Sequence, residues 1–153
     1  MTKDVLIKIS GLQTDSLYEG ETENEPVEII TSASYFEKDG KHYLFYEELD
    51  QDSENVIKNR ITISEKSVQV QKSGYVTTSL TFEENSRTHS VYETPFGRMT
   101  LGITSGPMSL NISEDCILAG LSYELDINNN ALLDCRLILT IVPKSKGRML
   151  LNQ

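Results

Sequence analysis

Hydrophobic and polar residues alternate with a period of two along most of the chain. Two of the clearest runs are near residues 5–9, with apolar Val5, Ile7 and Ile9, and near residues 57–63, with apolar Ile57, Ile61 and Ile63. This period is typical of half-buried β-strands, whose successive side chains point to opposite faces. No stretch of ten or more residues keeps the 3.6-residue period of an amphipathic helix. The pattern therefore predicts an almost wholly antiparallel β protein.

Turn residues divide these runs into short strands. Asp39-Gly40 separates the runs 27–37 and 41–47, and this pair supplies the positive φ angles of a tight hairpin. Residues 64–67 form another short turn, and 94–97 reads Thr-Pro-Phe-Gly, which fits a type I turn. Gly106-Pro107 must break or bulge its strand, because proline cannot donate to a ladder.

The longest alternating stripe lies near the C-terminal end and predicts the centre of the core. It continues across the turn at Asn128–Asn130. About ten strands at this short spacing favour a closed barrel, which leaves no sheet edge to protect. We expect the interior of that barrel to take Leu121, Tyr123, Leu125, Leu137, Leu139 and Ile141.

The size of the chain predicts a single domain covering residues 1–153. Its hydrophobic content of 38% and charged content of 24% are those of a globular protein. Residues 10–26 carry two glycines and five acidic positions with little apolar content, which predicts a long surface connection. Residues 144–153 are mainly polar and are expected to fray.

The net charge of −9 limits the classes of partner that the protein can bind. Fourteen Lys and Arg residues stand against 23 Asp and Glu residues, with no basic cluster among them. Such a surface repels nucleic acid and anionic membranes alike. The segment Met1–Ile9 lacks the apolar run of a signal peptide, and no window approaches the roughly 18 apolar residues of a spanning helix. We expect a cytoplasmic protein that contacts neither nucleic acid nor membrane.

The two cysteines are predicted to remain free thiols. Facing residues in a hairpin centred on Asn128–Asn130 have numbers that sum to about 258, whereas 116 and 135 sum to 251. Cys116 and Cys135 would therefore be staggered and would point to opposite faces, so a disulfide is geometrically implausible.

Residues 74–97 carry a resemblance to a known family. The stretches Gly74-Tyr75-Val76-Thr77-Thr78 and Arg87-Thr88-His89-Ser90-Val91-Tyr92-Glu93-Thr94-Pro95-Phe96-Gly97 resemble the YwiB-like family of small uncharacterised bacterial proteins, and the likeness extends over nearly the whole chain. The resemblance implies a calycin-like (lipocalin-like) β-barrel in the cytoplasm. It implies no activity and carries over no catalytic or ligand-binding residue.

Polar residues gather around the turn at Pro95. Arg87, His89, Tyr92, Glu93 and Arg98 could converge on a small anion. The simpler interpretation is that the turn needs its proline and glycine for backbone reasons and that the charges form solvated cross-strand pairs. Both interpretations stay open, and this cluster is the best candidate site in the sequence.

Arg60 and Arg136 are the candidate anchors inside a barrel. Inward arginines of calycin-like barrels often hold a ligand carboxylate, since the planar guanidinium matches it with two hydrogen bonds. The alternative places the face of Lys58 and Arg60 outside and pairs Arg136 with an acidic neighbour such as Glu124 or Asp126. For Lys58 the alternative is favoured; for the two arginines the choice stays open.

Catalytic and metal-binding chemistry has little support. His42 and His89 are the only histidines, and neither has the spacing of a metal ligand. We expect His42 on the surface of a strand. Asp50, Asp52 and Glu54 alternate but lack the glycine and the final acid of a calcium loop. No cofactor motif is present.

Three classes of function follow. A binding module would hold a small acidic or amphipathic molecule in an interior cavity of the barrel, with Arg60, Arg87, His89, Tyr92, Arg98 and Arg136 as the candidate contacts. An interaction or regulatory protein would have a filled barrel and an exposed apolar patch instead. An enzyme ranks third, with His89 and Glu93 as the only pair to consider.

Overall fold

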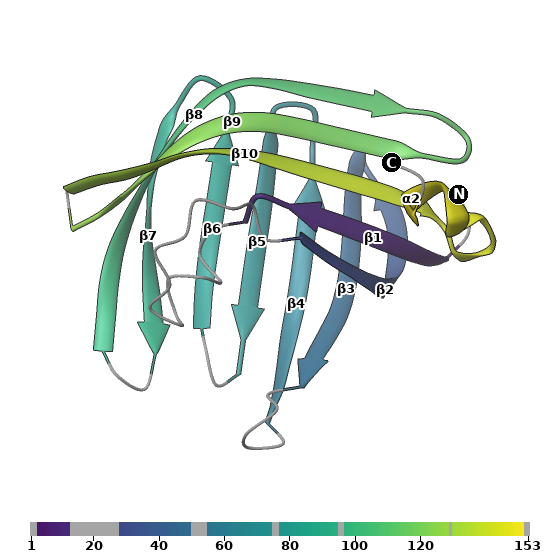
Figure 1. Cartoon of the computed structure of the whole chain (residues 1–153), viewed down its shortest axis with the longest axis horizontal. Coiled ribbons are helices and arrows are strands. Elements are labelled where there is room, and N and C mark those ends of the chain that lie inside the picture. Colours follow the sequence, from purple (N-terminus) through teal and green to yellow (C-terminus); the bar gives the residue numbers. More distant parts are fainter. Residues whose placement is uncertain are drawn as a thin grey trace.

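Ten antiparallel strands close into one barrel, as the alternation predicted (Figure 1). The computed structural model describes residues 3–12, 28–49, 55–74, 77–94, 97–128 and 130–151. The strands are β1 (Asp4–Ser10), β2 (Glu28–Lys38), β3 (Lys41–Leu49), β4 (Val56–Ile63), β5 (Ser67–Ser73), β6 (Thr77–Glu83), β7 (Arg87–Thr94), β8 (Gly97–Ile112), β9 (Ile117–Ile127) and β10 (Asn130–Pro143). Each strand pairs with its neighbours in sequence, and β1 closes the barrel against β10.

The turns form where their residues predicted them. Asp39 and Gly40 have φ angles of 54° and 77° and join β2 to β3. The register of β8 against β9 shifts between Ser105 and Met108, so Gly106-Pro107 produces a bulge and the strand continues beyond it. Pro95 and Phe96, the acidic residues at 50–54 and most of the 10–26 connection lie outside the described residues.

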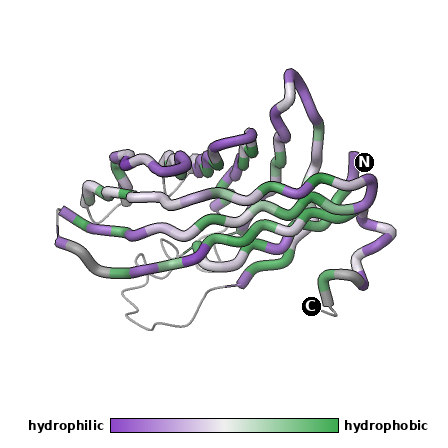
Figure 2. Tube along the Cα trace, turned by 90° about the horizontal axis from the view of Figure 1, so that it is seen from above, coloured by the Kyte–Doolittle hydropathy of each residue, from purple (hydrophilic) through white to green (hydrophobic). Residues whose placement is uncertain are grey.

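The interior is filled by side chains of aliphatic and aromatic residues. Figure 2 shows hydrophobic and hydrophilic positions alternating along the strands. One row across the inner face consists of Leu44, Ile61, Val70 and Leu80, which are paired strand to strand and are at most 1% exposed. The stripe predicted for the interior, namely Leu121, Tyr123, Leu125, Leu137, Leu139 and Ile141, is confirmed, because each side chain is no more than 4% exposed.

The register of the last hairpin keeps the cysteines apart. Cys135 lies opposite Tyr123, and their residue numbers sum to 258, as predicted for this hairpin. Cys116 precedes β9. Both thiols are free and half-buried. Burial raises the pKa of each thiol above its ordinary value.

Residues 144–151, part of the segment for which polarity predicted fraying, include two short helical elements. Lys144–Lys146 form a 3₁₀ turn, η1, and Arg148–Leu151 form a short helix, α2. Leu150 is 2% exposed, so its side chain packs between this segment and the barrel. No helix among the described residues is long and apolar enough to cross a membrane.

Candidate ligand-binding groove

A groove with a volume of about 830 Å³ crosses the outer face of β3 to β7. Its centre is one cross-strand row in which Phe45 lies opposite Arg60, Arg60 opposite Gln71, and Gln71 opposite Ser79. Val91 and His89, both exposed, line it from β7. The groove therefore combines cationic, hydroxyl, amide and apolar side chains with one carboxylate, Glu93, which is paired with Arg98.

The alternation of β4 explains why Arg60 faces outward. Asn59 and Ile61 on either side of it are 2% and 0% exposed, so the pleat turns Lys58 and Arg60 to the outside. The alternative in which the Lys58 face lies outside is the one that the structure supports. The interpretation of Arg60 as an anchor inside the barrel does not hold.

Arg60 and Lys58 form no ion pair with the carboxylates that the structure describes. The Nη2 group of Arg60 donates a hydrogen bond to Oε1 of Gln71, its cross-strand neighbour. A guanidinium has five donors in a planar fork, so this bond leaves capacity for an anion. The two cations stand two residues apart on the same face of β4.

Arg87, by contrast, is neutralised by a carboxylate from β9. Its Nη1 lies 2.6 Å from Oδ2 of Asp126 and its Nη2 lies 3.2 Å from Oδ1, while Nη1 also donates to Oγ1 of Thr104 at 3.1 Å. The hydrogen bond from Arg87 lowers the pKa of the Asp126 carboxyl, and the same bond raises the pKa of Arg87. The pair covers Gly102, where a Cβ would come within 2.4 Å of Nη2.

The other residues around the Pro95 turn do not converge on one point. Arg98 pairs with Glu93 at 3.0 Å, and both side chains are exposed. Tyr92 is 2% exposed and points into the barrel. The Arg98–Glu93 contact matches the interpretation of cross-strand pairs. His89 is the basic residue of this cluster that lines the groove.

Arg136 lies on the opposite side of the barrel from Arg60. It is exposed, alternates with the buried Leu137, and lines a separate depression of about 560 Å³ on β8 to β10. Arg136 therefore does not point into the barrel either. The candidate anchors nominated from the sequence are divided between two surfaces.

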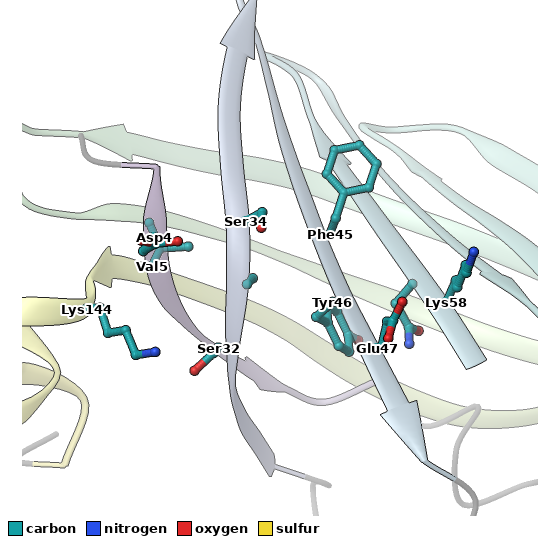
Figure 3. Close-up of a pocket in the computed structure, with 11 residues that line it drawn as sticks. Asp4, Val5, Ser32, Ser34, Phe45, Tyr46, Glu47, Lys58 and Lys144 are labelled. Atoms are coloured by element: carbon teal, nitrogen blue, oxygen red, sulfur yellow. The ribbon is translucent and has the colours of Figure 1, made fainter. Parts of the chain in front are cut away.

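A second hollow adjoins the groove at Phe45 and Lys58. Its volume is about 520 Å³, and it forms where the ladder between β2 and β3 ends at Ser34 and Phe45. Figure 3 shows Phe45 and Lys58 on its rim, and the ring of Tyr46 in the space between the two strands. The first half of β2 pairs with β1 along its other edge, and its pairing with β3 begins only at Ser34.

The barrel interior contains a polar cluster that the sequence reasoning missed. Glu48 accepts hydrogen bonds on Oε1 from Asn59 Nδ2 at 2.9 Å and from Lys72 Nζ at 3.1 Å. Asn59 and Lys72 are 2% and 5% exposed. Each interrupts an otherwise apolar stripe of its strand, and that interruption is the signal by which they could have been found.

His42 also lies inside, although a surface position was expected. It is 2% exposed, stacks on Tyr35, and its Nδ1 lies 2.8 Å from the Tyr35 hydroxyl oxygen. Burial raises the pKa of Tyr35. Within the described ranges, no three His, Cys, Asp or Glu side chains gather in a way that could hold a metal ion.

The fold and the surface define a small antiparallel ten-strand β-barrel with its polar groove on the outside. Residues 7–139 match the family described as Domain of unknown function (DUF1934), and the chain belongs to this family.

Two comparisons place the chain beside a relative from Bacillus subtilis. The curated protein described as "Uncharacterized beta-barrel protein YwiB" of Bacillus subtilis (strain 168) is 26% identical over 119 residues, which are 77% of this chain and 82% of that protein. The crystal structure of the ywiB protein from Bacillus subtilis superposes with a TM-score of 0.71 at 20% identity and covers 92% of both chains. At this level of identity, the structural likeness shows a shared fold and nothing about function.

Proposed function

We propose that this protein binds a small acidic, amphipathic molecule in the outer groove of β3 to β7. Arg60 would receive the acidic group, and Phe45 and Val91 would contact the apolar part. The observation that carries the proposal is the pair Arg60 and Lys58, which have no carboxylate partner among the described residues, in a chain of net charge −9. On a surface that is otherwise mostly negative, two cations without an ion-pair partner direct an anion to this groove.

The dimensions and chemistry of the groove support this class of ligand. A volume of about 830 Å³ falls within the range of small-molecule sites. An arginine fork binds a carboxylate or phosphate with two hydrogen bonds, and His89 adds a third cation beside Arg60 and Lys58 when it is protonated. The resemblance to calycin-like barrels supports a binding role by analogy only. The proposal includes a cytoplasmic setting, which the two free cysteines support because the cytoplasm keeps thiols reduced.

A protein interaction module is the second candidate. Phe36 stacks on Tyr43 and Phe45 on the outer face of β2 and β3, with ring centroids 4.7 and 5.7 Å apart. Phe36 is 46% exposed and Phe45 is 38% exposed, so part of this aromatic surface faces solvent. A partner that covers it would compete with a ligand for Phe45.

Thermal denaturation with added octanoate tests the proposal. A ligand at about 100 times its dissociation constant should stabilise the protein by about 2.7 kcal/mol, which raises the melting temperature by several degrees. Arg60→Gln should abolish this increase without changing the melting temperature of the free protein, because Arg60 is exposed.

Arg136→Gln is the matched control, because Arg136 is equally an exposed arginine but lines the separate depression on β8 to β10. It should keep the full response to octanoate. A response that survives in Arg60→Gln, or the lack of any response up to millimolar octanoate, nucleotide or aromatic carboxylate, would contradict the proposal and favour the interaction module.

A further inference from the structure

The second half of β8 is an open sheet edge. β7 pairs with β8 only over Gly97–Thr104, whereas β9 pairs with it as far as Ile112. Figure 1 shows this half of β8 along the upper side of the molecule, with β9 beside it. The turn between β6 and β7 also contacts β8, because the Asn85 N–H donates to the Gly106 carbonyl at 3.1 Å. After that point no described strand covers the segment Met108–Ile112.

The pairing with β9 fixes which backbone groups face outward from this edge. Ser113 N–H donates to the Cys116 carbonyl at 2.8 Å, and hydrogen-bonded pairs recur at every second residue of an antiparallel ladder. Ser109 and Asn111 therefore bond to β9, and the peptide groups of Leu110 and Ile112 face away from it. The Met108 N–H confirms this direction, because it donates to Glu84 Oε2 at 2.8 Å on the side away from β9.

Leu110 and Ile112 thus present N–H and C=O groups that have no partner in the part of the chain that the structure describes. Ile112 is 56% exposed, and a groove of about 450 Å³ runs between Met108, Leu110 and Ile112 on one side and the charged turn residues Glu65, Lys66 and Glu84 on the other. Proteins commonly protect such an edge with lysine or an inward charge. The five residues Met-Ser-Leu-Asn-Ile contain no charge, in a chain that is 24% charged.

We propose that this edge pairs antiparallel with the same edge of a second copy and forms a two-fold symmetric dimer. In a register centred on Leu110, residues whose numbers sum to 220 face each other. Leu110 then faces Leu110 of the second copy, Met108 faces Ile112, and Ser109 faces Asn111. Apolar residues meet apolar residues, polar residues meet polar residues, and no like charges lie directly opposite.

The backbone groups are also complementary in this register. The Leu110 N–H donates to the Leu110 carbonyl of the second copy, and the Ile112 N–H donates to the Met108 carbonyl. Both donors are those left without a partner at the edge, so the pairing requires no rearrangement of β9. The Glu84 carboxylate must release the Met108 N–H before that group can donate to the Ile112 carbonyl of the second copy. Because two copies of net charge −9 repel each other, added salt should strengthen the dimer.

Sedimentation velocity from about 1 μM to about 1 mM protein tests the dimer, since a short edge contact is expected to be weak. The wild-type mass should rise from 17.2 kDa towards twice that value with concentration, and further in 0.5 M salt as repulsion is screened. Ile112→Pro should stay monomeric, because it removes the outward N–H and leaves the β9 ladder intact. Ile112→Val keeps the N–H and should dimerise like the wild type.

Amide hydrogen exchange of the wild-type protein provides a test that no folding defect can imitate. The Leu110 and Ile112 amides should exchange quickly at low concentration and slowly at high concentration, whereas those of Ser109 and Asn111 stay protected throughout. A mass of 17.2 kDa at every concentration and salt, or dimerisation of a folded Ile112→Pro, would overturn the proposal. Arg60→Gln should leave the association unchanged, so this result is independent of the ligand groove.

Discussion

At the scale of single residues, Gly11 is the position where the backbone tolerates least change. Its φ is +85°, and a Cβ would come 1.8 Å from the Arg136 carbonyl oxygen. Gly40 also has a positive φ but has no atom within 4 Å of its Cβ position. Gly11→Ala should lower the free energy of unfolding by about 2–4 kcal/mol, and Gly40→Ala by about 1 kcal/mol. Urea denaturation measures both, and equal losses would contradict the close approach of β1 to β10.

Asp126 should make the stability of the protein depend on pH in the acid range. The hydrogen bond from Arg87 lowers the pKa of this carboxyl in the folded state, so its contribution is fully present above the ordinary aspartate pKa of about 3.9. The contribution is lost as the pH falls through the lower folded pKa. Asp126→Asn should therefore be less stable than the wild type at pH 7, and the difference should shrink below pH 4. A difference that is constant with pH would show that the ion pair does not stabilise the fold.

At the scale of elements, the strands and turns could be predicted because their signals are local. The Asp39-Gly40 turn, the bulge at Gly106 and the register of the last hairpin each follow from a few neighbouring residues. The pair of Arg87 and Asp126 could not be found in the same way, since 39 residues separate its members. Periodicity also fails for Lys72, because a polar residue on an apolar stripe needs a partner known only from the fold.

The order of the C-terminal segment arises from one such contact that the sequence pattern hides. Residues 144–153 appear polar, yet Leu150 is 2% exposed and Gly147 approaches Leu6 of β1, whose Cδ1 would lie 2.5 Å from a Cβ at Gly147. A helix as short as α2 is not stable on its own, so packing must hold it. The apolar run Met149-Leu150-Leu151 is too short to show a helical period, so the sequence pattern could not predict that packing.

Leu150→Ala tests this contact. The loss of a buried leucine side chain should lower the free energy of unfolding by about 2–3 kcal/mol. Arg148→Ala, an exposed position in the same helix, should cost less than about 0.5 kcal/mol. Urea denaturation of both variants distinguishes a docked segment from a frayed one, for which neither change would matter.

At the scale of the whole molecule, the barrel places its chemistry outside because its interior is occupied. The closed order of the strands directs one side-chain stripe of each strand inward, and large apolar residues fill most of these positions. Arg60 and Arg136 then have only the outer face available. The candidate site that the sequence suggested for the barrel interior therefore becomes a groove on the outer surface, a difference that depends on the phase of two arginines relative to the pleat.

Closure also predicts that the barrel unfolds as one unit. β1 pairs with both β2 and β10, so the first strand of the chain completes the ring formed by the rest. Ile7 lies on β1, faces Ile141 of β10 and is 0% exposed. Ile7→Ala should lower the free energy of unfolding by about 3 kcal/mol, while Leu118→Ala, at a position 39% exposed on β9, should cost about 1 kcal/mol or less. Tyrosine fluorescence and far-UV circular dichroism should give coincident urea transitions for the wild type and both variants. An early fluorescence change in Ile7→Ala, with most of the circular dichroism signal retained, would mean that β1 detaches from a sheet that is stable without it.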